Sequence, residues 1–261
     1  MSSGRIERRS PIWRFIGCAV LPAFGLISAI AGPAAAQEPH WVTDSFSGCR
    51  SWDPYGDAFT ATSFIWIGGC IGADKTADGP GVALLAGAGG VSVIPQKVTG
   101  KDNSDFLAYN ADGSIAFESA HYGFPGPGHE SERMIVATAG ARSRIVDCRE
   151  FRDVNGKQAP VATCDNQTLR NDPLFVTTTA IDAEVWTSLA PARLNDAADA
   201  ALARGWTFGA ALVFIKVIEF YPNGPEARVA REALQHIGET DAKAVAQAER
   251  LHRIVNTGIS L

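Results

Sequence analysis

The chain has 261 residues, a formal net charge of −5 and no block of Lys or Arg after its first fourteen residues. An acidic chain of this kind repels phosphate backbones and anionic lipids, which argues against a nucleic acid or a membrane surface as its main partner. A protein, a sugar or a cation is the expected partner.

Residues 1–36 have the pattern of a secretory signal peptide. The apolar segment Phe15 to Ala31 is short for a membrane anchor, which is the alternative, and Pro22 interrupts it. Cleavage near residue 36 would remove a charge of +3 from the total of −5 and leave a mature chain of −8 in the periplasm or outside the cell. The basic start and the small residues before the cleavage site are Arg5, Arg8, Arg9, Arg14 and Ala34-Ala35-Ala36.

Four of the five cysteines lie in the mature chain: Cys49, Cys70, Cys148 and Cys164. In an oxidising compartment an even number predicts disulfides, and four cysteines allow three connectivities. Proximity in the sequence favours Cys49 with Cys70 and Cys148 with Cys164. The second pair flanks Asn155-Gly156, a strong hairpin turn signal, with a one-residue mismatch that requires a bulge or a three-residue loop. A metal site is the alternative, but no CxxC spacing occurs.

Residues 37–165 predict an antiparallel β domain, because short β-prone runs alternate with Gly, Pro and Asn turn signals. Asn110-Ala111-Asp112-Gly113 predicts a hairpin turn between two of the runs. Residues 166–181 begin with a polar stretch that ends in Pro173, and we interpret them as a linker. The runs are Phe59 to Ile67, Val82 to Leu85, Val91 to Ile94, Phe106 to Tyr109, Ile115 to Glu118, Met134 to Thr138 and Arg144 to Phe151.

Residues 182–261 predict an α-helical domain, because apolar residues recur at steps of three and four. Four helices are expected: Pro191 to Arg204, Thr207 to Phe220, one that starts at Pro225 and closes with Gly238, and one that Thr240 caps. The second is apolar nearly all round, so it should be buried on more than one side.

The segment from Cys49 to Gly81 resembles degenerate MORN-like modules of exported bacterial proteins. Their pattern is W-x-G-x-C, a short turn and A-x-G-x-G, and here it reads Trp66-x-Gly68-Gly69-Cys70 and Ala77-x-Gly79-x-Gly81, with a longer turn. The resemblance implies a β-hairpin with a packed Trp and a disulfide, and it carries over no catalytic residue.

Residues 191–256 resemble tetratricopeptide repeats. Ala210-x-x-x-Phe214, with Pro222 eight residues later, fits the second half of that pattern, although the aromatic residues expected early in the repeat are missing. The resemblance implies helical hairpins and protein binding, while an ordinary small bundle is the alternative.

A search for catalytic motifs leaves only weak candidates. His121 and His129 flank a Gly/Pro loop and, with Glu130 or Glu132, offer the groups of a hydrolase site. The Gly87-Ala88-Gly89-Gly90 stretch lacks the spacing of a phosphate loop, and His236 and His252 are expected on helix surfaces. Two acidic loops, Asp74 to Asp78 and Asp102 to Asp105, are alternatives for calcium, and Trp41, Trp52 and Trp66 for a sugar.

The sequence therefore favours an α+β protein: a disulfide-stapled antiparallel β domain followed by a C-terminal helical hairpin domain. The expected function is a non-catalytic role in the periplasm or cell envelope through binding of another protein, with no cofactor, no nucleic acid and no membrane span in the mature chain. A periplasmic hydrolase using the loop from His121 to Glu132, and a carbohydrate or cell-wall binding module, are the alternatives.

Overall fold

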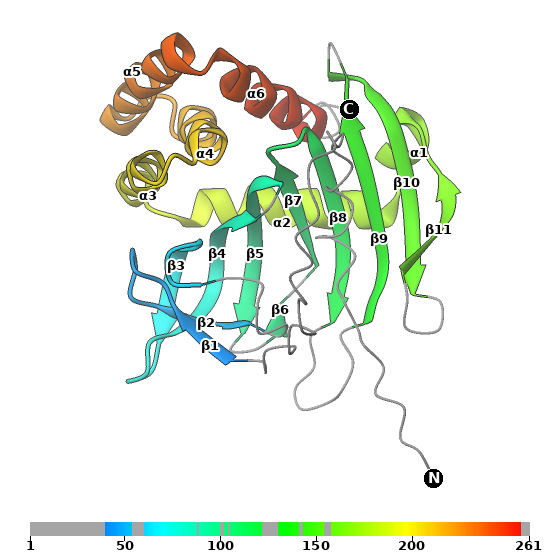
Figure 1. The fold of residues 1–261 in the computed structure, drawn as a ribbon, viewed down its shortest axis with the longest axis horizontal. Coiled ribbons are helices and arrows are strands. Elements are labelled where there is room, and N and C mark those ends of the chain that lie inside the picture. Colours follow the sequence, from blue (N-terminus) through cyan, green and yellow to red (C-terminus); the bar gives the residue numbers. More distant parts are fainter. Residues whose placement is uncertain are drawn as a thin grey trace, which may run out of the picture.

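The fold is α+β, with one large sheet followed by a layer of helices. The computed structural model describes residues 40–53, 60–87, 89–99, 102–103, 105–121, 130–140, 143–153 and 158–256. Figure 1 shows α2 lying across the sheet and the later helices gathered beyond one end of its strands. The predicted signal peptide lies outside the described residues.

The described strands form one sheet in the order β1-β2-β4-β5-β7-β8-β9-β10-β11, with β3 paired to β4 and β6 paired to β5. All of the pairings are antiparallel except the short one between β2 and β4. The strands are β1 (His40–Thr43), β2 (Arg50–Asp53), β3 (Phe64–Ile71), β4 (Thr76–Gly87), β5 (Gly90–Thr99), β6 (Asp102–Asn103), β7 (Phe106–Asn110), β8 (Ser114–His121), β9 (Glu130–Ala139), β10 (Ile145–Asp153) and β11 (Gln158–Thr163).

The four helices expected from the periodicity are present, with small differences at their ends. The helix that starts at Pro225 continues through Gly238 to Thr240, and Asp241 rather than Thr240 accepts the hydrogen bond from the backbone of the last helix, at 3.0 Å from Ala244 N. The helices are α1 (Asn166–Arg170), α2 (Pro173–Ser188), α3 (Pro191–Ala203), α4 (Thr207–Phe220), α5 (Pro225–Thr240) and α6 (Ala242–Asn256).

The expectation of a linker over residues 166–181 is wrong, because the segment is helical. Asp165 caps α1, and Asp172 caps α2 with Pro173 in its first turn. The β-branched residues of α2 have a low helix propensity, so propensity alone does not predict this helix. Thr178 and Thr179 are buried, and each hydroxyl donates to the carbonyl four residues earlier, at 2.7 and 2.8 Å. Burial against the sheet therefore decides the conformation of this segment.

The β3–β4 hairpin is built around Trp66, which is fully buried. Its indole lies over Gly81 on the facing strand and over Gly68, where an added Cβ would come within 2.6 Å of the ring. The ring nitrogen donates to Gly69 O at 3.0 Å. Gly68 and Gly81 are thus required by the close approach of the indole ring.

The two later hairpins follow the turn signals of the sequence. Tyr109 pairs with Ile115 across the β7–β8 turn, in which Gly113 has a φ of +92° that favours glycine. Strands β10 and β11 pair on either side of residues 154–157, and their register shifts between Glu150 and Phe151. That shift is the irregularity that the unequal spacing of the cysteines requires.

Sheet and helices share one hydrophobic core. It contains Leu84, Val93 and Phe117 from the strands together with Phe175 and Phe214 from the helices. Helix α4 is buried from Phe208 to Val217, as its apolar sequence predicts, and Gly209 allows it to approach β5 closely. No helix in the described part of the chain has the length and hydropathy needed to cross a membrane.

Candidate functional site

Two disulfides brace the sheet. Cys49, just before β2, is bonded to Cys70 near the end of β3, and Cys148 on β10 is bonded to Cys164 just after β11. The Cα atoms lie 5.7 and 5.0 Å apart. These are the two pairs that proximity in the sequence favours, and they fit an exported protein.

The loop proposed for a hydrolase lies largely outside the described residues. The backbone of His121 pairs with that of Glu130 at the ends of β8 and β9, so the loop joins two neighbouring strands. His129 lies outside the description, and Glu132 is placed on β9 by its backbone alone. The hydrolase site therefore stays a prediction.

The tryptophans proposed for sugar binding and the acidic loop residue Asp74 proposed for calcium binding have other contacts in the structure. Trp66 is fully buried in a smaller cluster separate from the core that sheet and helices share, and it has no face open to a sugar. Trp41 and Trp52 pack edge to face at 5.3 Å, with Arg50 over the Trp41 ring at 4.5 Å. Asp74 forms an ion pair with Arg50 at 2.6 Å. Within the described ranges, no group of three or more His, Cys, Asp or Glu side chains is arranged to hold a metal ion.

The most unusual chemistry lies inside the helical layer, in a group that we call the inner cluster. At its centre is Lys216 of α4, whose side chain is fully buried. Its ammonium lies 2.8 Å from Asp182 Oδ2 of α2, and the other oxygen of Asp182 accepts from Trp186 Nε1 at 2.7 Å. The rings of Tyr109, Trp186 and Phe220 surround the ammonium at 5.3 to 5.9 Å. The members of the inner cluster are Tyr109, Asp182, Trp186, Lys216, Glu219, Phe220, His252 and Asn256.

The outer part of the inner cluster joins α4 to α6. Glu219 Oε2 lies 3.8 Å from Lys216 Nζ and 3.6 Å from His252 Nδ1. Asn256 Nδ2 donates to Glu219 Oε1 and lies 3.1 Å from His252 Nε2. His252, expected on a helix surface, has a side chain that is only 16% exposed, whereas that of His236 is 77% exposed.

Burial shifts the protonation of these groups. It lowers the pKa of His252 to about 3, with a smaller effect from the positive charge of Lys216. It raises the pKa of Glu219, although Lys216 acts in the opposite direction. It also raises the pKa of Tyr109, to which the charge of Asp182 adds. The inner cluster thus favours a neutral histidine beside a carboxyl group that binds its proton more tightly than usual.

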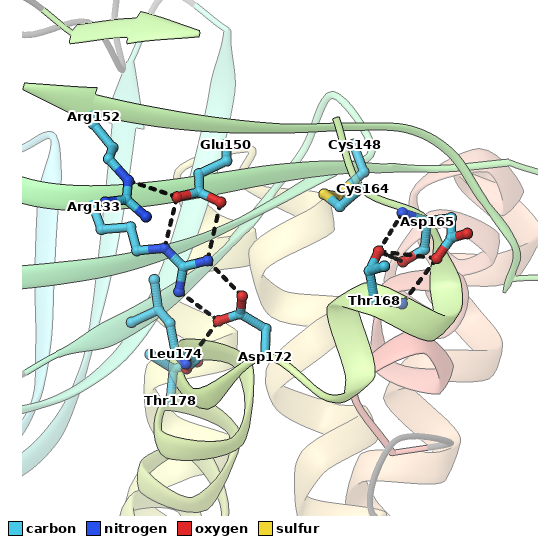
Figure 2. Close-up of polar contacts among 10 residues, drawn as sticks. All are labelled: Arg133, Cys148, Glu150, Arg152, Cys164, Asp165, Thr168, Asp172, Leu174 and Thr178. Carbon is cyan, nitrogen blue, oxygen red and sulfur yellow. Dashed lines mark hydrogen bonds and ion pairs between the residues drawn. A yellow bond between two sulfur atoms is a disulfide. The ribbon is translucent and has the colours of Figure 1, made fainter. Parts of the chain in front are cut away.

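A second polar group, the rim network, ties the start of α2 to the sheet (Figure 2). Arg133 of β9 binds Glu150 of β10 through two nitrogens, at 2.9 and 3.1 Å, and Asp172 through two more contacts, at 2.6 and 2.5 Å. Arg152 adds a bond of 2.8 Å to Glu150, and Asp172 accepts from Leu174 N as the N-cap of α2. The rim network consists of Arg133, Glu150, Arg152 and Asp172.

The rim network holds its carboxylates in the charged form. Hydrogen bonds from Arg133 lower the pKa of Glu150 to about 2. Burial of Asp172 opposes ionisation, but the hydrogen bonds from Arg133 and from Leu174 N outweigh it and lower the pKa of this carboxyl as well. The same bonds raise the pKa of Arg133.

No protein-family model, curated protein or solved structure matches the chain.

The rim network and the inner cluster both join helices to neighbouring elements, and each is suited to positioning. In the described part of the chain, the charged and titratable side chains of these two groups lie between helices and strands. There they contact one another. Sequence reasoning missed both groups, because Asp182, Lys216 and His252 are far apart in the chain. A weak signal was present in Lys216 and Glu219, the two charged residues in the otherwise largely apolar sequence of α4.

Proposed function

We propose that the protein is a non-catalytic component of the periplasm or cell envelope that acts by binding another protein through its helical layer. The two disulfides support the compartment, since such bonds form and persist in oxidising surroundings. The acidic net charge supports a protein partner over a nucleic acid.

The observation that carries the proposal is the outward position of α5. This helix packs on α3, α4 and α6 and forms the far side of the helical layer (Figure 1). Ala227, Ala230 and Ile237 are buried, but Val229, expected from its spacing to face the core, is 44% exposed. Val229 and the charged residues beside it give α5 an apolar centre with a charged frame, and protein interfaces have an apolar core with a polar rim.

The charged frame of this surface is formed by α5 itself. Arg228 lies 3.6 Å from Glu232, in an exposed pair that contributes little to stability. Arg231 donates to Pro222 O at 2.9 Å. Both guanidinium groups are well placed to meet carboxylates of a partner at little cost to the fold.

A crosslinking experiment tests this assignment. A photo-crosslinking residue is placed at Val229 and, as a matched control, at Val146 of β10, which is 68% exposed. In cells that export the full chain, we expect one defined partner to be captured from position 229 and not from position 146. The double variant Arg228→Glu/Arg231→Glu should abolish that capture. Capture of the same partner from position 146 alone would contradict the proposal.

The hydrolase alternative has its own test. Purified mature protein is assayed on ester, peptide and glycoside panels, and the proposal expects no turnover. Robust turnover that is lost in His121→Ala, with the fold retained, would replace the proposed function by the hydrolase.

A further inference from the structure

The proton positions in the outer part of the inner cluster follow from its hydrogen-bond geometry. The ionised carboxylate of Glu219 only accepts, so the Asn256 amide turns its NH₂ group towards Glu219 Oε1. The same NH₂ nitrogen lies 3.1 Å from His252 Nε2. That ring nitrogen must therefore carry a lone pair, and the single proton of the neutral imidazole is on Nδ1, which faces Glu219 Oε2 at 3.6 Å.

A second proton on His252 would disrupt this arrangement. Protonated Nε2 would point an N–H group at the NH₂ group of Asn256, and two donors cannot bond to each other. Rotation of the amide would relieve that clash only by turning the Asn256 carbonyl towards the Glu219 carboxylate, so Glu219 would have to be protonated too. The three side chains therefore accommodate a charged histidine only after a rearrangement that involves all of them.

The positive charges of Lys216 and Arg253 also oppose the extra proton, whereas the Glu219 carboxylate, 3.6 Å from His252 Nδ1, favours it. Lys216 of α4 is the nearest buried cation, and its main counter-charge, Asp182 of α2, is already engaged by Trp186. The titratable and charged groups around His252 are Lys216 and Glu219 from α4, Asp182 from α2, Tyr109 from β7, and Arg253 with its partner Glu249 from α6 itself.

We propose that Glu219, His252 and Asn256 form a latch that fastens α6 to α4 while His252 is neutral, and that the proton that His252 takes up in acid releases the last turn of α6. Residues 252–256 are the end of the last described helix, and opening of this turn would also break the hydrogen bond from Arg253 Nε to Ser143 Oγ, which is 3.0 Å long. Release would uncover the apolar side chains Ile254 and Val255, which the closed turn buries.

The direction of the pH effect follows from proton binding. The closed latch keeps the pKa of His252 at about 3, whereas the open turn exposes it to water, where histidine titrates near pH 6.5. The open form thus binds more protons between these values, and opening becomes more favourable as the pH falls below about 6.5. The closed latch raises the pKa of Glu219, so the closed form binds a proton at Glu219 more tightly than the open form does. Protonation of Glu219 therefore opposes opening, over a narrower pH range just above the ordinary pKa of a glutamate.

Hydrogen–deuterium exchange of the oxidised mature protein between pH 7 and pH 4.5 tests the latch. After correction for the intrinsic exchange rate, we expect the opening of residues 252–256 to increase by up to about tenfold per pH unit below about 6.5. Amides of α3 serve as the internal reference and should not follow this trend. Exchange of α6 that does not change with pH would overturn the proposal.

Three variants separate the roles of the groups. His252→Gln should remove the increase, and His236→Gln, at an exposed position of α5, should leave it unchanged. Glu219→Gln removes the opposing group, so the increase should become steeper. An undiminished increase in His252→Gln, or its loss in Glu219→Gln alone, would show that another group controls the opening.

Nitrogen NMR of the imidazole in the unmodified protein gives a test that needs no variant. The latch requires the His252 proton on Nδ1 at pH 7. A proton on Nε2 would contradict the geometry on which the proposal rests. Because the latch concerns the hold of α6 on α4, this result is independent of whether α5 binds a partner.

Discussion

The rim network and the inner cluster solve the same problem, the attachment of helices through charged groups, in different ways. At the rim, Arg133 reaches two carboxylates with paired hydrogen bonds and keeps 24% of its side chain in contact with water. Inside, Lys216 has one close carboxylate, and aromatic rings cover the remainder of its ammonium. The planar fork of arginine satisfies several acceptors at once, whereas lysine is a point charge that tolerates an aromatic enclosure.

The two groups also differ in how many of their polar atoms have a hydrogen-bond partner. In the rim network the carboxylates are fully engaged by donors. Within the described residues, Glu219 Oε2 and His252 Nδ1 of the inner cluster are buried and lie just beyond hydrogen-bond distance of each other. A network in which every polar atom has a hydrogen-bond partner rigidifies its surroundings. A network with unpartnered atoms leaves room for the side chains to rearrange. The rim network is therefore the fixed attachment, and the inner cluster the adjustable one.

The largest expected effect comes from removing the buried cation. Lys216→Met leaves the Asp182 charge uncompensated in the core and should lower the free energy of unfolding by about 3 to 5 kcal/mol. Urea unfolding measures this change. The double variant Lys216→Met/Asp182→Leu should recover part of the loss, since no lone charge remains. If Lys216→Met were as stable as the parent, the ion pair would not be what holds α4 to α2.

Breaking the rim network should cost less. Arg133→Met removes hydrogen bonds to two carboxylates that can still reach water, and we expect a loss of about 1.5 to 3 kcal/mol. Arg149→Met is the matched control on β10, because Arg149 is 56% exposed and pairs with Asp147 at 3.3 Å. The control should change stability by less than about 1 kcal/mol. Equal effects of the two substitutions would remove the distinction between the rim network and an ordinary surface pair.

Acid should reduce the contribution of the rim network. The pKa values of Glu150 and Asp172 are lowered in the folded protein, so their contribution is complete above the ordinary carboxyl pKa and is lost as the pH falls towards about 2. The difference in stability between the parent and Arg133→Met should therefore narrow from pH 7 to pH 2. Urea unfolding of both proteins at the two pH values provides the measurement. A constant difference would indicate that packing rather than charge holds Arg133.

The smallest expected effect is on the outer helix. Arg228→Glu/Arg231→Glu should change the free energy of unfolding by no more than about 0.5 kcal/mol per site, because both side chains are exposed and removed from the two polar groups. Thermal unfolding of the double variant checks this value. A loss as large as that of Arg133→Met would mean that α5 is scaffold, and the crosslinking result would then report on folding.

Local signals predicted much of the fold. The hairpin turn at Asn110 to Gly113, the proline at the start of α5 and the boundaries of α4 all depend on neighbours within a few residues. The pairing of Cys148 with Cys164 has the same basis, since one hairpin brings them together. The class α+β follows from these elements.

Neither polar group could be predicted in this way. Arg133 and Asp172 are 39 residues apart, and Lys216 and Asp182 are 34 apart. His252 resembles a surface residue in the helical pattern of α6, and only the position of α4 beside it makes it buried and neutral.

Short-range turn, cap and periodicity signals predicted the hairpins of the later strands and the course of α3 to α6, and proximity along the chain favoured the observed disulfide pairs among the three possible connectivities. Tertiary structure decided that residues 173–188 are a helix, since burial on the sheet outweighs the weak helix propensity of its β-branched residues. It also decided which charges lie inside. The free energy of a buried charge depends on partners and dielectric surroundings that only the packing of distant elements creates.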